Sequence, residues 1–153
     1  MTNDASDTAE TALAWAIART MMAREGTAPE WGIEIVGAGP GYSRLAMRLT
    51  PQMLNGHQNA HGGMIFALAD TAFAYACNSR NRTSVAQQAS INFIDAGRAG
   101  ERLEAEAREI AVKGRSGVFS ITVTGEDGRV VAQVQALSRV VGDAVVQWPE
   151  GKE

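Results

Sequence analysis

The chain has 153 residues, the usual size of one domain, and we expect a single domain over residues 1–153. Its 14 basic and 17 acidic side chains give a net charge of -3, which excludes the broad basic surface that nucleic acid binding requires. The longest apolar run is shorter than the roughly 20 residues of a membrane-spanning helix, and the lone Cys77 excludes an internal disulfide. We therefore expect a cytoplasmic protein that binds neither nucleic acid nor membranes.

The first predicted element is an amphipathic helix over about residues 8–25. Apolar side chains recur at helical spacing in "TALAWAIARTMMAR", and Gly26 and Pro29 then end the pattern. From Trp31 the period changes, because "WGIEIV" and "YSRLAMRLT" are short alternating runs separated by the turn-like "GAGPG". These two runs predict a β-hairpin.

A second helix is predicted over about residues 62–79, where "HGG" precedes an almost wholly apolar run. Four strands follow it: "ASINFIDA", "RLEAEAREIAV", "GVFSITVTG" and "RVVAQVQALSRVV". The composition of the second run favours a helix, but its strict alternation from Leu103 to Ala107 favours a strand, which we predict. The sequence thus predicts an α+β fold in which an antiparallel sheet of five or six strands wraps around the long central helix.

An open sheet edge or helix flank in a protein of this size is usually covered by a partner, so we expect a homo-oligomer.

Asp70 is the one carboxylate in the apolar helix. An ionised Asp removed from water costs several kcal/mol unless it is paired, hydrogen-bonded or protonated. No Lys or Arg lies between His61 and Ser79, so a partner must come from elsewhere in the fold or from a ligand. The sequence leaves two roles open for Asp70, a functional site or a hydrogen bond to a neighbouring element.

The glycines at the start of this helix supply a second polar group. The first N–H groups of a helix have no partner within it, and Gly62 has no side chain to block a ligand, so its amide suits an oxyanion or a carbonyl oxygen. A plain backbone requirement for glycine is the alternative. Asp70 lies eight residues further on, about 12 Å of helix rise, which is too far for both groups to touch one carbonyl group. If both act on one substrate, the second group must come from an antiparallel copy of the helix across a two-fold axis, at a subunit interface.

These residues carry a family resemblance. The stretch "MLNGHQNAHGGMIFALADTAFAYACNS", from Met53 to Ser79, closely resembles the core motif of the hotdog-fold acyl-CoA thioesterases of phenylacetic acid degradation. The resemblance implies a hotdog fold, dimers that assemble into tetramers as dimers of dimers, and hydrolysis of aromatic acyl-CoA thioesters such as phenylacetyl-CoA and its hydroxylated forms. It implies no metal and no other cofactor.

The same resemblance assigns roles to single residues. Asp70 is the expected nucleophile or general base, and the Gly62 amide of the facing subunit is expected to polarise the thioester carbonyl. Asn55 is expected beside the site, holding the attacking water or the substrate, and His61 is expected in a supporting role. The expected substrate-binding residues are Thr71, Gly63, Gln88, Arg82, Lys113 and Arg115, although the cations and Gln88 are also typical of ordinary surface positions.

One position departs from the family pattern. Close relatives commonly have an Arg-Pro pair after the strand that follows the central helix, whereas this chain has Asp95 and Ala96, with Arg98 two residues later. A non-catalytic acyl-CoA-binding hotdog module remains an alternative to the thioesterase. A hotdog hydratase or dehydratase is a third, but it requires a second acid–base pair that the sequence does not show.

Overall fold

The computed structural model describes residues 4–149, with side chains from residue 8 onward, so three N-terminal and four C-terminal residues of the expected domain lie outside the described residues. The fold has the predicted α+β composition, in which two helices precede a hairpin and a long helix precedes four strands. In chain order the elements are α1 (Asp4–Arg24), α2 (Thr27–Glu30), β1 (Glu34–Gly39), β2 (Tyr42–Arg48), the short 3-10 helix η1 (Pro51–Met53), α3 (Gly62–Asn78), β3 (Ser84–Phe93), β4 (Arg102–Lys113), β5 (Ser116–Thr124) and β6 (Val130–Val140).

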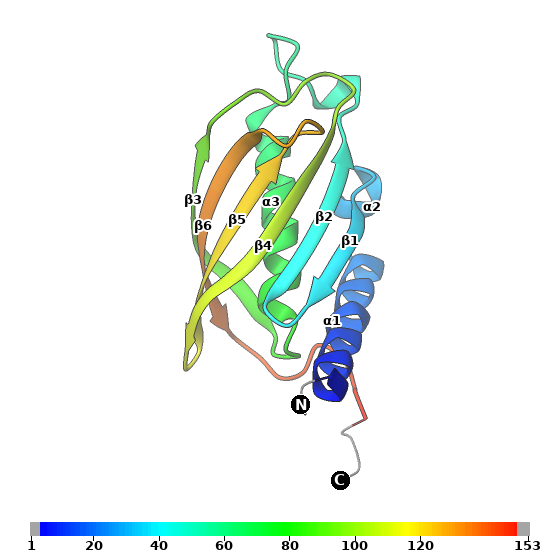
Figure 1. Ribbon diagram of the computed structural model, residues 1–153, viewed down its shortest axis with the longest axis vertical. Coiled ribbons are helices and arrows are strands. Elements are labelled where there is room, and N and C mark those ends of the chain that lie inside the picture. The colour runs from blue at the N-terminus through cyan, green and yellow to red at the C-terminus, as the bar shows by residue number, and fades with distance from the viewer. Residues whose placement is uncertain (1–3, 150–153) are drawn as a thin grey trace.

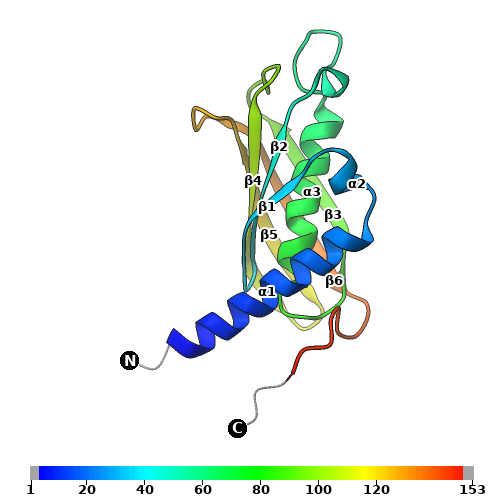
Figure 2. The ribbon, with the colours of Figure 1, turned by 90° about the vertical axis from the view of Figure 1, so that its right-hand side faces the viewer.

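The six strands form one antiparallel sheet in the order β1-β2-β4-β5-β6-β3. The sheet curves over one side of α3, which runs along its concave face, and α1 lies beside β1 and α3 (Figures 1 and 2). Strands β1 and β3 are the two edges of the sheet. Within residues 4–149, no helix is long and apolar enough to cross a membrane.

The predicted strands differ from the observed ones in two places. β4 is a strand, as its alternation predicts, because Leu103, Ala105 and Ala107 are buried on the α3 side. β3 begins at Ser84, five residues before the predicted start, since its polar first half carries no apolar alternation. β1 continues to Gly39, so the turn shrinks to two residues, and Gly41 takes the positive φ of +65° that this hairpin requires.

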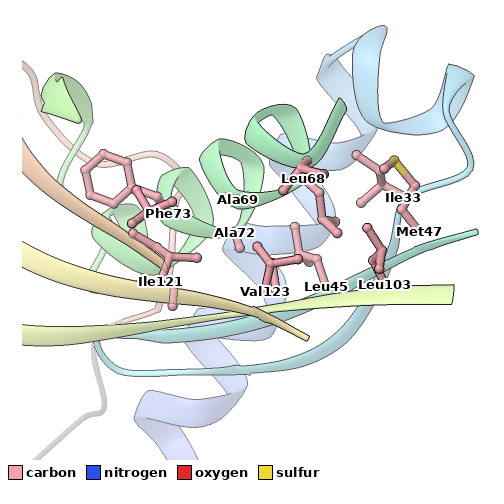
Figure 3. Close-up of a cluster of buried hydrophobic side chains, with 14 of the residues drawn as sticks. Ile33, Leu45, Met47, Leu68, Ala69, Ala72, Phe73, Leu103, Ile121 and Val123 are labelled. Carbon is pink, nitrogen blue, oxygen red and sulfur yellow. The ribbon is translucent and has the colours of Figure 1, made fainter. Parts of the chain in front are cut away.

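The core lies between α3 and the concave face of the sheet (Figure 3). Leu45, Leu68 and Ile121 are fully buried, and the rings of Phe73 and Phe119 meet edge to face with their centroids 5.4 Å apart. Buried alanines on α3, among them Ala69 and Ala72, let the helix approach the strands closely. The apolar residues of the central helix therefore position it rigidly against the sheet.

The opposite flank of α3 is not covered. The sequence leads us to expect an open helix flank that a partner covers, and Asp70 is exposed on this flank in the single chain. Residues three, four and seven positions from Asp70 share its side of a helix, and these are small or apolar. The exposed or half-buried residues of this open flank are Gly63, Phe66, Ala67, Asp70, Ala74 and Cys77.

Candidate active site

The N-terminus of α3 presents one free backbone donor. His61 is the N-cap, and its Nδ1 accepts a hydrogen bond of 2.9 Å from the Gly63 N–H. The Gly62 N–H has no hydrogen-bond partner among the described residues. Because the helix dipole adds positive potential at this end, the Gly62 amide is suited to a carbonyl oxygen or an oxyanion.

Phe93, which the sequence analysis did not single out, explains why residue 62 is a glycine. A Cβ at Gly62 would lie 3.0 Å from Cζ of Phe93, closer than side-chain carbons ordinarily approach. The Phe93 ring is 54% exposed, at the end of the edge strand β3. No local sequence signal links the two residues, because they meet only through the tertiary fold.

Asp70 lies on the same helix as Gly62, eight residues away, which is about 12 Å of helix rise. Its carboxylate has no hydrogen bond and no ion pair among the residues that the structure describes. Partial removal from water raises the pKa of the Asp70 carboxyl above its ordinary value, and the negative charge of Glu25 raises it further. Asp70 is thus an unpaired and unusually basic carboxylate on the open flank of α3.

Asn55 and His57 lie in the loop that precedes α3. The Asn55 Oδ1 accepts hydrogen bonds from the His57 N–H at 2.9 Å and the Asn59 N–H at 3.2 Å, which hold a tight turn with Gln58 at a φ of +63°. The Asn55 amide nitrogen has no partner among residues 4–149, so it is free to donate to a water or a ligand. In the described part of the chain, no three His, Cys, Asp or Glu side chains gather as they would around a metal ion.

The predicted substrate-binding residues on α3 and β3 are not all placed with Asp70. Thr71 is buried, and its hydroxyl donates to the Ala67 carbonyl at 2.7 Å, while the Gly63 amide is used by the His61 cap. Gln88 is exposed on β3. Since its neighbour Ala89 packs against the core, Gln88 points to the outer face of the sheet, away from α3.

The predicted cations gather at the other end of α3. Arg82 follows the helix and reaches the carbonyl of Gly114, while Lys113 and Arg115 flank that glycine in the β4–β5 hairpin. Arg82 and Arg115 line one groove, together with Arg80, which is paired with Glu109. None of Arg82, Lys113 and Arg115 forms an ion pair within the described residues, so these charges are free to meet an anion.

The departure at Asp95 belongs to an ion-pair network that is partly buried, since Glu101 is buried and Asp95 is exposed. Arg129 donates to both carboxylate oxygens of Glu101 at 2.7 Å, and its Nε lies 3.5 Å from the Asp95 carboxylate. Hydrogen bonds from Arg129 lower the pKa of the Glu101 carboxyl to about 2. The loop that this network holds also accepts a hydrogen bond from the Ala60 N–H through the Gly97 carbonyl, and so it supports the entry to α3.

Comparisons with known proteins identify the family. The thioesterase superfamily matches residues 57–132. The acyl-coenzyme A thioesterase PaaI of Escherichia coli is 39% identical over 132 residues, which span 86% of this chain and 94% of that protein. The solved structure of the E. coli PaaI protein from the phenylacetic acid degradation operon has a TM-score of 0.86 at 38% identity, covering 88% of this chain and 97% of that chain.

A third comparison concerns ligand binding. The crystal structure of a Streptococcus mutans protein bound to acetyl-CoA has a TM-score of 0.71 at 27% identity, covering 73% of this chain and 90% of that one. The similarity to PaaI extends over nearly the whole of both proteins. The chain therefore belongs to the thioesterase superfamily, with the hotdog fold, and is an acyl-CoA thioester hydrolase.

Proposed function

We propose that this enzyme hydrolyses phenylacetyl-CoA or its hydroxylated forms to the free acid and CoA. The substrate class is supported by the similarity to PaaI from the phenylacetic acid degradation operon. The observation that carries the catalytic assignment is the pair of groups on α3: an unpaired Asp70 carboxylate and a free Gly62 N–H. Because about 12 Å of helix separates them, one chain does not bring both to the same carbonyl carbon.

In the proposed dimer, two α3 helices run antiparallel across a two-fold axis. Asp70 then faces the partner's Gly62, and the axis passes near Phe66, midway between the two positions. The open flank of α3 supplies the small and apolar contacts that such a pairing needs. The free edge of the sheet at β3 is a second surface without a partner, and Val85, Phe93 and Ile94 are exposed along it. The second copy would cover both surfaces and would remove Asp70 further from water.

The proposed reaction uses few groups. Asp70 either removes a proton from the attacking water or attacks the thioester carbonyl itself, and the N–H of the partner's Gly62 stabilises the negative charge that develops on the carbonyl oxygen. The C–S bond then breaks and CoA leaves as a thiolate, which is a good leaving group. If Asp70 removes a proton from water, the free acid forms directly and the proton passes from Asp70 to the CoA thiolate. If Asp70 attacks the carbonyl, an anhydride between Asp70 and the acyl group forms, and water then hydrolyses it to the free acid and restores the Asp70 carboxylate. Asn55 would hold the water or the substrate, and His61 would keep the Gly62 amide in place by capping α3.

The free cations fit the CoA phosphates in this arrangement. Along the antiparallel pair, the C-terminal end of α3 lies beyond the partner's Gly62, on the side from which an extended phosphopantetheine arm would enter. Arg82, Lys113 and Arg115 stand at that end without ion pairs among the described residues. We assign them to the phosphates. Thr71, Gly63 and Gln88 stay as proposed substrate contacts. In the single chain the Thr71 hydroxyl and the Gly63 amide already have hydrogen-bond partners within α3 and its cap, and Gln88 points to the outer face of the sheet.

We further propose a tetramer built as a dimer of dimers that acts in the cytoplasm. The lone Cys77 is consistent with a reducing compartment. The test is direct: purified protein is mixed with phenylacetyl-CoA, hydroxyphenylacetyl-CoA and straight-chain acyl-CoA esters, and thiol release is followed with a chromogenic reagent.

The matched variants are Asp70→Asn and Asp143→Asn, which make the same chemical change at the proposed base and at an exposed position. We expect fastest release from the aromatic esters, loss of turnover in Asp70→Asn, and wild-type turnover in Asp143→Asn. Unchanged thiol release in Asp70→Asn would refute the catalytic assignment. Wild-type protein that binds the esters and releases no CoA would be a binding module instead.

A further inference from the structure

One loop of the sheet contacts the start of α3 at two points. This support loop, residues 94–101, connects β3 to β4. The Gly97 carbonyl accepts a hydrogen bond of 2.8 Å from the Ala60 N–H, two residues before the Gly62 amide. Phe93, directly before the loop, is the residue that a Cβ at Gly62 would meet. The loop and the residue before it therefore contact the chain on both sides of the N-cap of α3.

Gly97 packs against the segment that leads into α3 without room for another atom. A Cβ at Gly97 would lie 2.8 Å from Cβ of Ala60 and 3.1 Å from Cδ1 of Leu49, closer than carbon atoms ordinarily approach. Ala60 and Leu49 are both buried, and the Leu49 N–H donates to the Glu101 carbonyl at 2.8 Å. Because close-packed interiors transmit displacements, a shift of the support loop would move the segment that carries Ala60.

The Arg129 guanidinium ties the support loop to the sheet. Arg129, directly before β6, donates to the Ala96 carbonyl at 2.6 Å and to both carboxylate oxygens of Glu101 at 2.7 Å. Glu101 also accepts a hydrogen bond of 2.8 Å from the Arg98 N–H, which closes the end of the loop. The Arg129 side chain is 14% exposed and that of Glu101 is 7% exposed, so these charge-assisted hydrogen bonds are largely shielded from water.

We propose that Arg129 is a positioning residue of the active site, which fixes the support loop so that the Gly62 N–H keeps the direction that stabilises the oxyanion. This inference rests on the proposed role of the Gly62 amide. The guanidinium holds the Ala96 carbonyl, and the next carbonyl along the chain, that of Gly97, holds the Ala60 N–H. In this arrangement Arg129 acts through the loop and not by contact with the substrate. Misplacement of a catalytic group by about 1 Å costs about 10²-fold in rate, so a small shift of the loop has a measurable effect.

The first test creates and then relieves a clash between the loop and the start of α3. Gly97→Ala places a Cβ against Ala60, so kcat for phenylacetyl-CoA should fall by about 10-fold to 10²-fold while KM stays within about threefold of wild type. Ala60→Gly removes the opposing Cβ, so the double variant should recover kcat to within about threefold of Ala60→Gly alone. An unchanged kcat in Gly97→Ala would overturn the proposal, as would a double variant that is no faster than Gly97→Ala.

Arg129→Lys tests the guanidinium itself. Lysine keeps the positive charge beside Glu101, but it lacks the planar fork that reaches both carboxylate oxygens and the loop carbonyl, so kcat should fall about tenfold. The control Arg108→Lys makes the same change at an exposed ion pair on β4 and should keep the wild-type kcat.

The Gly62→Pro background separates positioning from stability. A role of Arg129 in stability alone would lower kcat by the same factor in every background. Gly62→Pro already lacks the N–H that Arg129 is proposed to position, so adding Arg129→Lys to it should change kcat by less than about twofold. Equal losses in the two backgrounds would overturn the proposal.

Hydrogen–deuterium exchange with mass spectrometry follows the loop without turnover. In Arg129→Lys, deuterium uptake should rise in peptides that cover residues 53–61 and 94–101, while β5 keeps its wild-type uptake. Wild-type uptake in both segments would overturn the proposal. If Gly62→Pro and Gly62→Ala turn over equally, the proposed role of the Gly62 amide fails. If Gly62→Pro alone is slow and Arg129→Lys keeps the wild-type kcat, only this inference fails.

Discussion

Replacing Gly62 with proline removes one backbone N–H from the proposed oxyanion site. Proline is well tolerated at the first position of a helix, because that N–H has no partner within the helix and the fixed φ suits the helix start. The preceding His61 already has a φ of -61° and a ψ of 133°, the extended conformation that a residue before proline prefers. We therefore expect α3 to fold normally in Gly62→Pro.

Gly62→Pro adds a Cβ near Phe93 and removes a hydrogen-bond donor, and these two changes set the expected loss of kcat. The new Cβ would lie 3.0 Å from Cζ of Phe93, so the Phe93 ring has to shift by a few tenths of an ångström in Gly62→Pro and in Gly62→Ala alike. Loss of one oxyanion donor lowers kcat by about 10²–10³-fold, or about 2.7–4 kcal/mol of transition-state stabilisation. Gly62→Ala introduces the same Cβ and keeps the N–H, so the ratio of the two variants isolates the donor.

The assay is the rate of thiol release from phenylacetyl-CoA at saturating substrate, with circular dichroism as the check on folding. We expect kcat of Gly62→Ala to stay within about tenfold of wild type, while Gly62→Pro falls by about 10²–10³-fold below it. Equal kcat values in the two variants would show that the Gly62 amide does not stabilise the oxyanion.

Three further predictions concern stability and binding. The pKa of Asp70 is higher in the folded state than in the unfolded chain, so the native state loses stability as pH rises from the unfolded pKa to the folded pKa. Asp70→Asn removes this loss and should raise Tm at pH 7 in scanning calorimetry. A lower Tm would contradict this reasoning. Glu101→Gln leaves Arg129 incompletely paired and should cost about 1.5–3 kcal/mol in urea unfolding at pH 7, the range for hydrogen bonds to charged groups. This difference should shrink as pH falls from 4.5 to about 2, where wild-type Glu101 also becomes protonated, and a pH-independent difference would exclude the ion pair as its cause. The double variant Arg82→Ala and Arg115→Ala should raise KM for phenylacetyl-CoA with little change in kcat, and an unchanged KM would remove these cations from the CoA site.

Much of the fold was predictable because its signals are local. The glycine pair and the apolar run mark the start and length of α3, and the alternation around Ala105 identifies β4 as a strand despite its helix-favouring composition. The first half of β3 was missed, because an edge strand with polar residues on both faces lacks an apolar period.

The candidate site was only partly predictable for a different reason. Asp70 and Gly62 stand out within one short motif, but the sequence suggested that Asp70 is buried, whereas the single chain leaves it exposed. Its burial depends on a second subunit, which no local pattern specifies. The contacts of Phe93 with Gly62 and of Gly97 with Ala60 join residues that are distant in sequence, so only the tertiary structure brings them to attention.

The central claim is that each active site combines Asp70 of one subunit with the Gly62 amide of its partner. Complementation between two inactive variants tests this claim most directly. Asp70→Asn and Gly62→Pro subunits with different affinity tags are co-expressed, and the mixed dimers are purified through both tags. In a mixed dimer, one of the two sites then contains an intact Asp70 and the intact amide of the partner's Gly62.

The assay compares thiol release from phenylacetyl-CoA by the mixed dimers, by each parent variant and by the wild type. The shared site predicts that the mixed dimers recover about half of the wild-type kcat per dimer, since one of two symmetric sites is restored. If both groups act within one chain, every subunit of the mixed dimer carries a defect, and activity at the level of the parent variants would contradict the account.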